Sequence, residues 1–564
     1  MEKQTTRYFL LTACLVALTF LPFIGLSDFN TKGEPREAVV AYSMIETGNW
    51  VLPQNNGGDI AYKPPMFHWA IAAVSSVVGE VNEYTSRMPS AVALIVMTLA
   101  IYLFYARRKN AEIAFWTALI TFTNFEMHRA GANCRVDMVL TLFIVLALLQ
   151  LFRWTERGLR GFPVWAILFM GCATLTKGPV GIILPCMVTA VYLWLRGWRF
   201  WPVVWRFALV ALASCVLPVI WYAAAYRQGG DDFLYLVYEE NVLRFIGKMP
   251  YGSHENPWPY NVMTVLTGFA PYTLLALFLG LAHLKGLKNL NFNFKAWRPL
   301  KALREMDDAR LFSLLSIVLI FVFYCIPKSK RSVYLLPIYP FIAYFLAEWI
   351  VRAVKQTPRP VYIYGGFLSL VSLLFLGAFM LIRLDLVPAS IFTGKHVAEN
   401  QAFLQALQQA SYSTMSIFII VFLFFVTLYL ISALKYRRRL LPGILAVTLG
   451  LYFALDSFVL PAVLGRKSDR MVVEKIETAA AGDRIYSYVK TDMLHFFTIN
   501  FYQGNTIVPF EMEMPQSGNL LVGEKDFPEF AARHTGYEFS LVYDSRHRSC
   551  DTRQNIQLYK FYKK

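Results

Sequence analysis

Long apolar runs alternate with short polar stretches along the chain as far as residue 460. Most of the runs approach the roughly 20 residues that a helix needs to cross a bilayer. We predict about thirteen membrane helices on this criterion, at residues 8–26, 88–105, 111–123, 137–152, 164–175, 180–195, 203–225, 261–284, 311–326, 333–350, 361–382, 414–433 and 441–460. The fold class is therefore a mainly α-helical, polytopic membrane protein. The composition agrees, since 56% of the 564 residues are hydrophobic and only 16% are charged.

Lys and Arg gather in every second loop between the predicted helices. Examples are Arg107-Arg108-Lys109 after the second helix and Arg437-Arg438-Arg439 before the last. Because cytoplasmic loops carry an excess of these residues, we expect a cytoplasmic N-terminus in a bacterial inner membrane. After an odd number of spans the C-terminus is then periplasmic. This topology explains the net charge of +17 better than nucleic-acid binding does.

Two segments lie outside the predicted spans. Residues 27–87 form a first periplasmic loop, in which helices are expected from Pro35 to Gly48 and over 66–78. The second of these helices is too short to span the membrane, so we expect it to lie along the interface. From residue 466 strands alternate with helices, which predicts a small periplasmic α/β domain over 466–564. Residues 1–465 would be the membrane domain that carries catalysis.

Ionisable residues gather at the ends of apolar segments, and the predicted topology puts them all at the outer face. They occur in Glu34-Pro35-Arg36-Glu37, Lys63-Pro64-Pro65, Arg135-Val136-Asp137, Lys177-Gly178-Pro179, Glu239-Glu240-Asn241 with Arg244, and Lys328-Ser329-Lys330-Arg331. Charges beside a bilayer are costly, so this gathering suggests a reaction centre.

Each of these charges also has a structural interpretation. Glu34 suits the positive end of a helix dipole, which local evidence alone favours, and Asp137 suits a helix cap. Lys177 sits in a tight turn and could serve only to end a span. Lys63, stiffened by two prolines, suits a phosphate as well as it suits a lysine that reaches from an interfacial helix to water.

Two outer loops favour ligand binding more strongly. Residues 227–260 mix carboxylates with aromatic rings, as sugar binding requires, although a structured interfacial loop would look similar. The cluster at 328–331 breaks the rule that outer loops avoid cations. A lipid-linked phosphate explains it better than contact with anionic head groups, because Lys63 and Lys177 lie on the same side.

These motifs together resemble the aminoarabinose transferases, GT-C glycosyltransferases close to the protein O-mannosyltransferases. The resemblance rests on Gly33-Glu34-Pro35-Arg36-Glu37-Ala38, Gly48-Asn49-Trp50-Val51-Leu52-Pro53, Tyr62-Lys63-Pro64-Pro65, Arg87-Met88-Pro89-Ser90, Arg135-Val136-Asp137, Thr176-Lys177-Gly178-Pro179, Glu240-Asn241-Val242-Leu243-Arg244-Phe245, Pro257-Trp258 and Lys330-Arg331-Ser332-Val333-Tyr334. It covers nearly the whole membrane part. The family has an Asp-Glu pair where this chain has Gly33 and Glu34, and often a Glu where it has Tyr62.

The resemblance implies sugar transfer from a polyprenyl-phosphate donor to a periplasmic acceptor, first of all lipid A. It implies catalytic roles for Glu34, Asp137 and Glu240. Binding of the lipid phosphate and sugar would fall to Asp28, Arg36, Lys63, Lys177, Arg244, Lys330, Arg331 and Tyr334, with Asp28 a substitute for the missing acid. Removal of Glu34 or Lys63 is expected to abolish transfer without loss of folding. A divalent cation is the one cofactor left open.

Other functions stay open at this point. A protein O-glycosyltransferase or O-mannosyltransferase would use the same donor class with a protein acceptor. A multi-span transporter or lipid flippase fits less well, since transporters place charges near the bilayer midplane and show internal repeats. Membrane lipids are expected partners, and nucleic acid is not. The sugar, the choice between lipid A, protein and another glycan as acceptor, and the oligomeric state are undetermined by the sequence.

Overall fold

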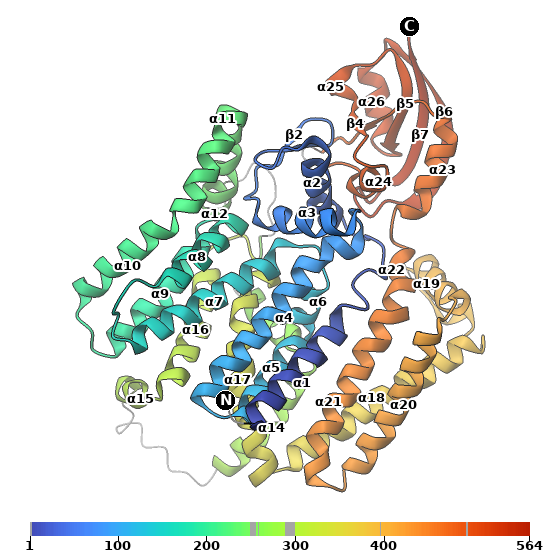
Figure 1. Ribbon diagram of the computed structural model, residues 1–564. Coiled ribbons are helices and arrows are strands. Elements are labelled where there is room, and N and C mark those ends of the chain that lie inside the picture. Colours follow the sequence, from blue (N-terminus) through green and yellow to red (C-terminus); the bar gives the residue numbers. More distant parts are fainter. Residues whose placement is uncertain are drawn as a thin grey trace.

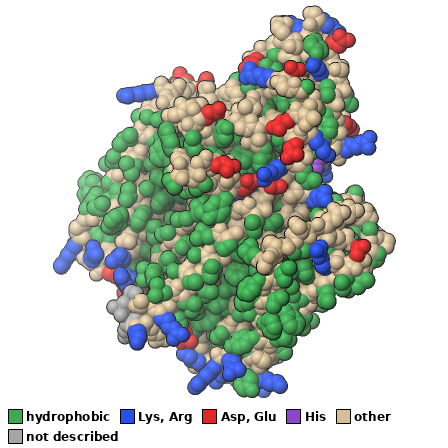
Figure 2. Space-filling model, turned by 45° about the vertical axis from the view of Figure 1, so that its right-hand side comes forward, with side chains coloured by type: hydrophobic (Ala, Val, Ile, Leu, Met, Phe, Trp, Pro, Cys, Tyr) green, Lys and Arg blue, Asp and Glu red, His purple; other side chains and the backbone are tan. Residues whose placement is uncertain are grey.

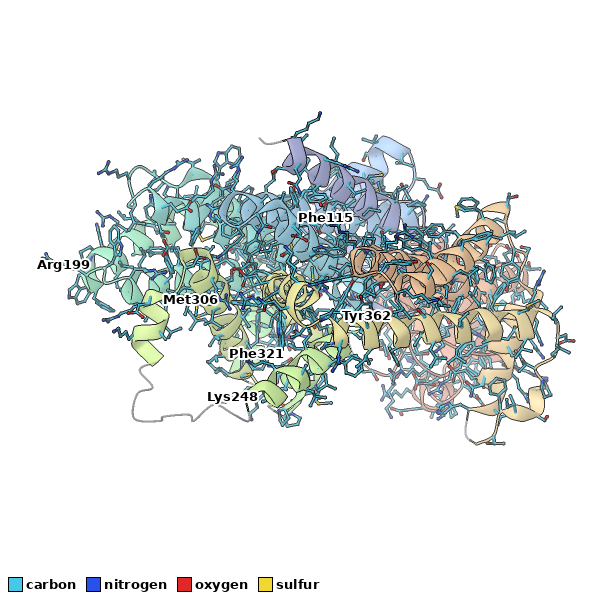
Figure 3. All side chains as sticks on the ribbon, turned by 90° about the horizontal axis from the view of Figure 1, so that it is seen from below. Phe115, Arg199, Lys248, Met306, Phe321 and Tyr362 are labelled. Atoms are coloured by element: carbon cyan, nitrogen blue, oxygen red, sulfur yellow. The ribbon has the colours of Figure 1, made fainter. Side chains whose placement is uncertain are left out.

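A computed structural model describes residues 3–246, 248, 255–257, 259–287, 299–394, 396–491 and 494–564. Helices dominate this part of the chain, and Figure 1 shows them as a bundle with a small α/β unit at one upper corner. Viewed from below, the bundle is elongated, with Arg199 at one end and the long helix that carries Tyr362 toward the other (Figure 3).

The helices of the bundle follow one another with short connections. They are α1 (Lys3–Phe20), α4 (Glu83–Arg108), α5 (Ala111–Thr123), α6 (Phe125–Gly131), α7 (Val136–Glu156), α8 (Val164–Lys177), α9 (Val180–Leu195), α10 (Phe200–Ser214), α11 (Val216–Tyr238), α13 (Pro259–Gly268), α14 (Tyr272–Leu287), α15 (Pro299–Glu305), α16 (Asp308–Cys325), η3 (Ser332–Ile338) with α17 (Tyr339–Gln356), α18 (Arg359–Arg383), η4 (Ala389–Ile391), α19 (Val397–Gln409), α20 (Thr414–Ala433), and α21 (Arg437–Ala454) with η5 (Leu455–Val459) and α22 (Leu460–Gly465). All thirteen predicted segments fall on these helices.

Within the described residues, seven helices are long and apolar enough to cross a membrane, and two bent helix pairs raise the number to nine if each pair is one span. Four shorter apolar helices accompany them. The chain is thus a multi-pass membrane protein. Hydrophobic side chains cover a broad band on the face in Figure 2, with Lys and Arg along its lower rim.

Two predicted spans are broken helices. The segment at 203–225 is α10 and α11, bent by 40°, and the segment at 261–284 is α13 and α14, bent by 101°. In each pair a proline, Pro218 or Pro271, follows the break closely. Proline donates no N–H and clashes with the carbonyl four residues earlier. Apolar periodicity continues across such a residue, so the sequence pattern alone predicted a single helix.

The prediction of a loop over 227–260 was wrong in its first half. Helix α11 continues to Tyr238 across a kink at Gly230, and is followed by a π-helical turn, η1 (Glu239–Leu243), and α12 (Arg244–Ile246). Polar residues concealed this helix because its outer turns leave the apolar bundle. Trp258, which the family motif includes, lies outside the described residues.

The first outer segment has the predicted helices. Helix α2 (Gly33–Thr47) ends at Gly48 with φ of 68°, and α3 (Met66–Val78) ends at Gly79 with φ of 94°. Glycine adopts this left-handed conformation without the penalty that a Cβ brings. A short hairpin, β1 (Gln54–Asn55) and β2 (Asp59–Ile60), joins the two helices. Figure 1 shows α2 and α3 beyond the upper ends of the bundle, beside the α/β unit.

The C-terminal residues form a five-stranded sheet. Its strands are β3 (Ile485–Tyr488), β4 (Val508–Pro509), β5 (Ser517–Gly523), β6 (Tyr537–Arg548) and β7 (Asn555–Lys563), in the order β4-β3-β5-β7-β6. Strands β4, β3 and β5 are parallel, while β7 and β6 are antiparallel to their neighbours. Separate apolar clusters, one including Ile476 and Leu521 and the other Phe510 and Phe530, form its core.

The helices of this unit are α23 (Arg470–Ala480), α24 (Phe497–Tyr502), α25 (Phe510–Glu513) and α26 (Phe527–Arg533). The predicted alternation of strands and helices is present. Helix α24 begins later than the predicted residue 492, which itself lies outside the described residues. Helix α23 was not predicted, although Val472, Val473 and Ile476 follow a helical spacing and are buried.

Candidate active site

Glu34 lies in a closed ion pair at the start of α2. Both of its carboxylate oxygens accept bonds from Arg87, from Nε at 2.8 Å and Nη2 at 3.1 Å, and Oε1 also accepts the Cys134 N–H at 2.9 Å. Arg87 also donates to the carbonyls of Ile24 and Ser27. Glu34 is only 4% exposed. The pair therefore ties the ends of α1, α2 and α4 together at the residue that precedes α7.

Three residues on, Glu37 is the centre of a second buried network. Its Oε1 accepts bonds from Lys63 at 2.6 Å and Arg36 at 3.2 Å, and its Oε2 lies 2.8 Å from Nε2 of His68. Burial acts to raise the pKa of the Glu37 carboxyl, but Lys63, the His68 hydrogen bond and Arg36 outweigh it. The pKa therefore lies well below its usual value, and Glu37 stays ionised.

Lys63 is the cation of this network with the most labile charge. Burial lowers its pKa to about 8, and neighbouring Arg36 contributes in the same direction more than Glu37 opposes it. The positive potential around Lys63 is therefore high enough to favour loss of its proton. A bound anion would relieve this repulsion and restore the charge.

Arg135 fills the space above Gly33. A Cβ built on Gly33 would lie 2.2 Å from Cζ and Nη2 of Arg135, far inside contact distance. Arg135 directly precedes α7, so this packing joins the start of α7 to the start of α2. The glycine that replaces the acid expected from family resemblance is therefore the residue that admits this guanidinium.

We expect Gly33→Ala to displace Arg135 and to lower transfer activity about tenfold, as misplacing one charged group in a site does. Stability should change little, because a guanidinium on a flexible side chain can move. The helix glycine Gly366, where an added Cβ meets open space, supplies the control Gly366→Ala. Activity and thermal unfolding of both variants, assayed side by side, test this. Wild-type activity in Gly33→Ala would contradict it.

Asp137, in the first turn of α7, pairs with Lys177 at the end of α8. The Lys177 ammonium also lies over the ring of Tyr334, 4.4 Å from its centroid. Asp137 is buried, while the Lys177 side chain is 28% exposed. The three residues thus come from α7, α8 and η3 and form one contact.

Glu240 and Arg244 pair with each other across one turn of η1 and α12. The hydroxyl of Tyr62 donates to Glu240 Oε1 at 3.3 Å. Glu240 also acts electrostatically on Lys63 and Arg36. The hydroxyl of Tyr62, where the family often has a carboxylate, therefore links the Lys63 segment to η1.

Arg331 lies at the start of η3, within the influence of the other pairs. Burial lowers the pKa of its guanidinium, and Arg135 and Arg244 add to the effect while Tyr334 and Asp137 oppose it. Lys32 is in the same field, since burial, Arg36 and Arg331 lower its pKa. These shifts show that the cations of five different segments face one another.

Most of the predicted site residues therefore form one cluster. Its cations are Lys32, Arg36, Lys63, Arg135, Lys177, Arg244 and Arg331, and its carboxylates are Glu37, Asp137 and Glu240. Cations outnumber carboxylates, so this part of the chain is suited to bind an anion.

The structure does not bring two of the predicted residues into this role. Asp28 accepts a bond from Arg470 of α23 at 2.8 Å and so connects to the C-terminal unit, not to the cluster. The buried ammonium of Lys330 donates to the carbonyl of Pro327 at 2.6 Å. It supports its own turn, because a buried ammonium must find an acceptor.

Sequence reasoning missed Lys32, Glu37, Tyr62, His68 and Arg135 as site residues. Glu37 and Arg135 belong to motifs that were recognised, and the one-turn spacing from Glu34 to Glu37 was the available sign of a second carboxylate. His68 gave no sign, because its pairing with Glu37 depends on how α3 packs against α2.

Within the described residues, one trio of possible metal ligands has donor atoms within 4.8 Å of one another: Asp469, Cys550 and Asp551. It lies in the C-terminal unit. Its carboxylates already accept bonds from Ser549, from Thr498 and from the Cys550 N–H. The donor set is thus engaged within the protein, and no step is assigned to a metal there.

Comparison with known proteins agrees with this fold and site. Residues 62–222 match the family described as dolichyl-phosphate-mannose-protein mannosyltransferase. The chain is 27% identical over 404 residues to an undecaprenyl phosphate-alpha-4-amino-4-deoxy-L-arabinose arabinosyl transferase of Shewanella sediminis, covering 68% of each chain. It is 25% identical to the enzyme of that name from Aeromonas hydrophila, over 91% of this chain and 90% of the relative.

The solved structure of ArnT from Cupriavidus metallidurans bound to undecaprenyl phosphate shares this fold, with a TM-score of 0.71, 18% identity and 98% of each chain covered. The class defined by fold and site is therefore a multi-pass membrane glycosyltransferase. More narrowly, the chain belongs to the aminoarabinose transferase-like GT-C glycosyltransferases.

Proposed function

We propose that this protein transfers a sugar from an undecaprenyl-phosphate donor to lipid A at the periplasmic face of the inner membrane. The observation that carries the proposal is the cluster in which cations outnumber carboxylates, at the junction of α2, α7, α8, η1 and η3. Its relatives include enzymes named for a sugar carried on undecaprenyl phosphate.

The proposal includes a topology of thirteen spans with the N-terminus in the cytoplasm. Residues 1–465 would be the membrane catalytic domain, with the first periplasmic loop at 27–87, and 466–564 a periplasmic α/β domain. The basic rim below the apolar band supports this orientation, because cytoplasmic loops concentrate Lys and Arg (Figure 2). The cluster then lies at the opposite, periplasmic end.

The cations would act on the leaving group. Cleavage of the bond between sugar and phosphate leaves negative charge on the polyprenyl phosphate. Lys63, Arg36 and Arg331 would stabilise that charge, and partial burial makes each more effective than it would be in water. Arg135, Arg244 and Lys177 would complete the phosphate site, with Tyr334 holding Lys177 in place.

The carboxylates would divide into structural and reactive groups. Glu34, buried and bound on both oxygens by Arg87, is a poor base, so we assign it the role of holding the site together. Glu37 would position Lys63 and Arg36. Glu240 and Asp137 are the groups that could take a proton from a hydroxyl acceptor. A phosphate acceptor is already ionised and would need only positioning.

Mass spectrometry of lipid A and of periplasmic glycoproteins, with and without the gene, tests the proposed function. We expect lipid A to lose one sugar on deletion and to regain it when the wild-type chain is supplied. A chain with Lys63→Met should not restore it. A change confined to glycoproteins would replace lipid A by a protein acceptor, in agreement with the family description. Unchanged lipid A and glycoproteins would refute the transferase.

The pKa of Lys63 gives the transfer reaction a predictable alkaline limit. Below pH 8 the amine is charged, and above it the phosphate loses that charge. We expect kcat/KM for the donor to fall as the pH rises through about 8, since this ratio reports the free enzyme. The limit in kcat should lie at higher pH, because the bound phosphate raises the pKa of the amine.

Initial rates from pH 6 to 10 would measure both limits. In Lys63→Arg the limit in kcat/KM should disappear from this range, because an arginine keeps its charge. The same limit in Lys63→Arg as in wild type would assign the titration to another group.

A further inference from the structure

A second cavity lies away from the cationic cluster, between the first outer segment and the C-terminal unit. Its volume is about 900 Å³, and it is lined by the end of α2, the end of α3, the start of α4 and α24. Glu37 and Glu46 both lie on α2, nine residues and so about 14 Å apart along its axis. The cavity is therefore distinct from the donor phosphate site.

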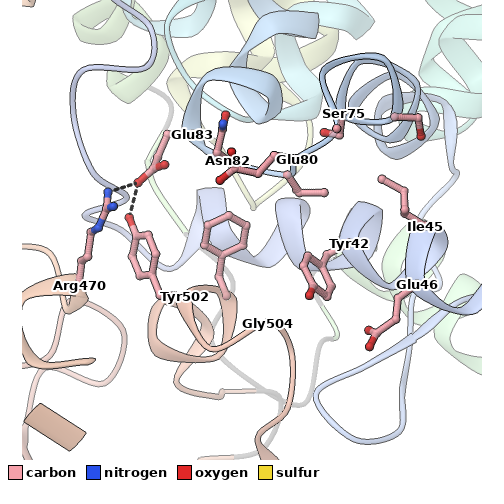
Figure 4. A pocket seen from close by; sticks show the side chains of 14 residues that line it. Tyr42, Ile45, Glu46, Ser75, Glu80, Asn82, Glu83, Arg470, Tyr502 and Gly504 are labelled. Atoms are coloured by element: carbon pink, nitrogen blue, oxygen red, sulfur yellow. Dashed lines mark hydrogen bonds and ion pairs between the residues drawn. The ribbon is translucent and has the colours of Figure 1, made fainter. Parts of the chain in front are cut away.

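Aromatic rings form one side of this cavity. Figure 4 shows Tyr42 of α2 and Tyr502 of α24 along the lower side, and Phe501 also lines it. Tyrosine offers an apolar face together with a polar tip, and it binds ligands that have both kinds of surface. Sugar rings, with C–H faces and hydroxyl edges, are such ligands.

Hydrogen-bond acceptors form the opposite side. Glu80, Asn82 and Glu83 project from the connection between α3 and α4, and Glu46 lies at the edge (Figure 4). Ionised carboxylates accept hydrogen bonds from hydroxyl and amino groups but donate none. Figure 2 shows Asp and Glu side chains gathered between the apolar band and the C-terminal unit.

The charge of the cavity excludes phosphate. Among the described lining residues Arg470 is the one Lys or Arg, and its guanidinium already bonds Asp28 at 2.8 Å and Glu83 at 3.1 Å. Carboxylates outnumber this single cation. An anion would meet repulsion here, whereas a neutral or amino-bearing ligand would not.

Ser75 supplies an independent sign of a ligand. Its residue is 1% exposed, it lines the cavity, and its hydroxyl has no hydrogen-bond partner among the described residues. Buried hydroxyls in folded proteins are nearly always bonded. A hydroxyl or amino group of a ligand in the cavity would supply the missing partner.

We propose that this cavity is a second saccharide site, which binds neutral or amino-bearing sugar units and rejects phosphate. Rings from α2 and α24 would stack on the sugar, while Glu46, Glu80 and Ser75 would bond its hydroxyl and amino groups. The binding is independent of the proposed transfer reaction, so the two can fail separately.

Calorimetry on the full-length protein, in a detergent without a sugar head group, tests this site. The probes are the disaccharides of N-acetylglucosamine and of glucosamine. We expect at least one to bind, and Tyr42→Ala and Glu46→Gln each to weaken binding about tenfold, or about 1.4 kcal/mol. Tyr562→Ala and Glu538→Gln, on the strands β7 and β6, are the matched controls and should bind as wild type does.

Ser75→Ala should weaken binding by a smaller factor without loss of folding, because it removes only an unpartnered hydroxyl. The proposal fails if neither disaccharide binds, or if Tyr42→Ala and Glu46→Gln bind as tightly as the controls. It also fails if inorganic phosphate or phosphoethanolamine displaces the bound saccharide. Glu46 is exposed, so Glu46→Gln keeps the test valid should Tyr42→Ala not fold.

Discussion

Replacing Lys63 by methionine is expected to lower the rate of sugar transfer at least about a hundredfold, the loss typical of removing one group that stabilises charge in a transition state. Lys63 is the cation whose amine combines a strained charge, with a pKa of about 8, and a partly exposed position. Methionine keeps the length of the side chain and removes only the charge.

The matched control is Lys475→Met, which changes a solvent-exposed lysine of α23. It should leave transfer unchanged. Thermal unfolding of both variants must be recorded, because Lys63 also neutralises Glu37. In Lys63→Met, Arg36 and His68 remain bonded to Glu37, so we expect the fold to survive. Transfer within threefold of wild type in a folded Lys63→Met protein would remove Lys63 from the reaction.

The second large effect concerns stability. Glu34→Gln is expected to destabilise the fold by roughly 3–5 kcal/mol, because it leaves the Arg87 guanidinium buried without its counter-charge. This changes the expectation drawn from the sequence, that loss of Glu34 would spare folding. The carboxylate is bonded to Arg87 and to the N–H of Cys134, so transfer and stability should fall together.

A double replacement separates the two interpretations of Glu34. Glu34→Gln with Arg87→Met removes both charges, and should cost less than the sum of the single changes. Glu156→Gln, which breaks the exposed pair with Arg108, is the control and should cost about 1 kcal/mol at most. If Glu34→Gln unfolds at the wild-type temperature but has lost transfer, Glu34 acts in the reaction after all.

Composition and periodicity were sufficient for the helices of the bundle. Residues 111–123, 180–195 and 414–433 form helices with the predicted bounds, because an apolar segment in a bilayer must satisfy its backbone hydrogen bonds internally. The two broken spans escaped the pattern, since one proline interrupts backbone bonding without interrupting hydrophobicity.

The charged motifs were visible in the sequence, but their partners were not. Glu34 and Glu37 differ by one helical turn, and either could have been the carboxylate of the site. Packing of α4 brings Arg87 to Glu34, while the turn before α3 brings Lys63 to Glu37. Which acid is locked and which positions the phosphate-binding cations depends on residues 26 to 53 positions away, at separations that no local pattern encodes.

The sequence by itself determined that this chain is a multi-pass membrane protein, and its motifs showed the resemblance to lipid-phosphate glycosyltransferases. Spans are long and uniformly apolar, and the positive charges between them are local, so both can be recognised one segment at a time. Only the tertiary structure decided that Arg135 occupies the space over Gly33 and that Asp28 turns to Arg470. Ion pairs form between the ends of helices that are distant in sequence, so only the packed fold assigns them.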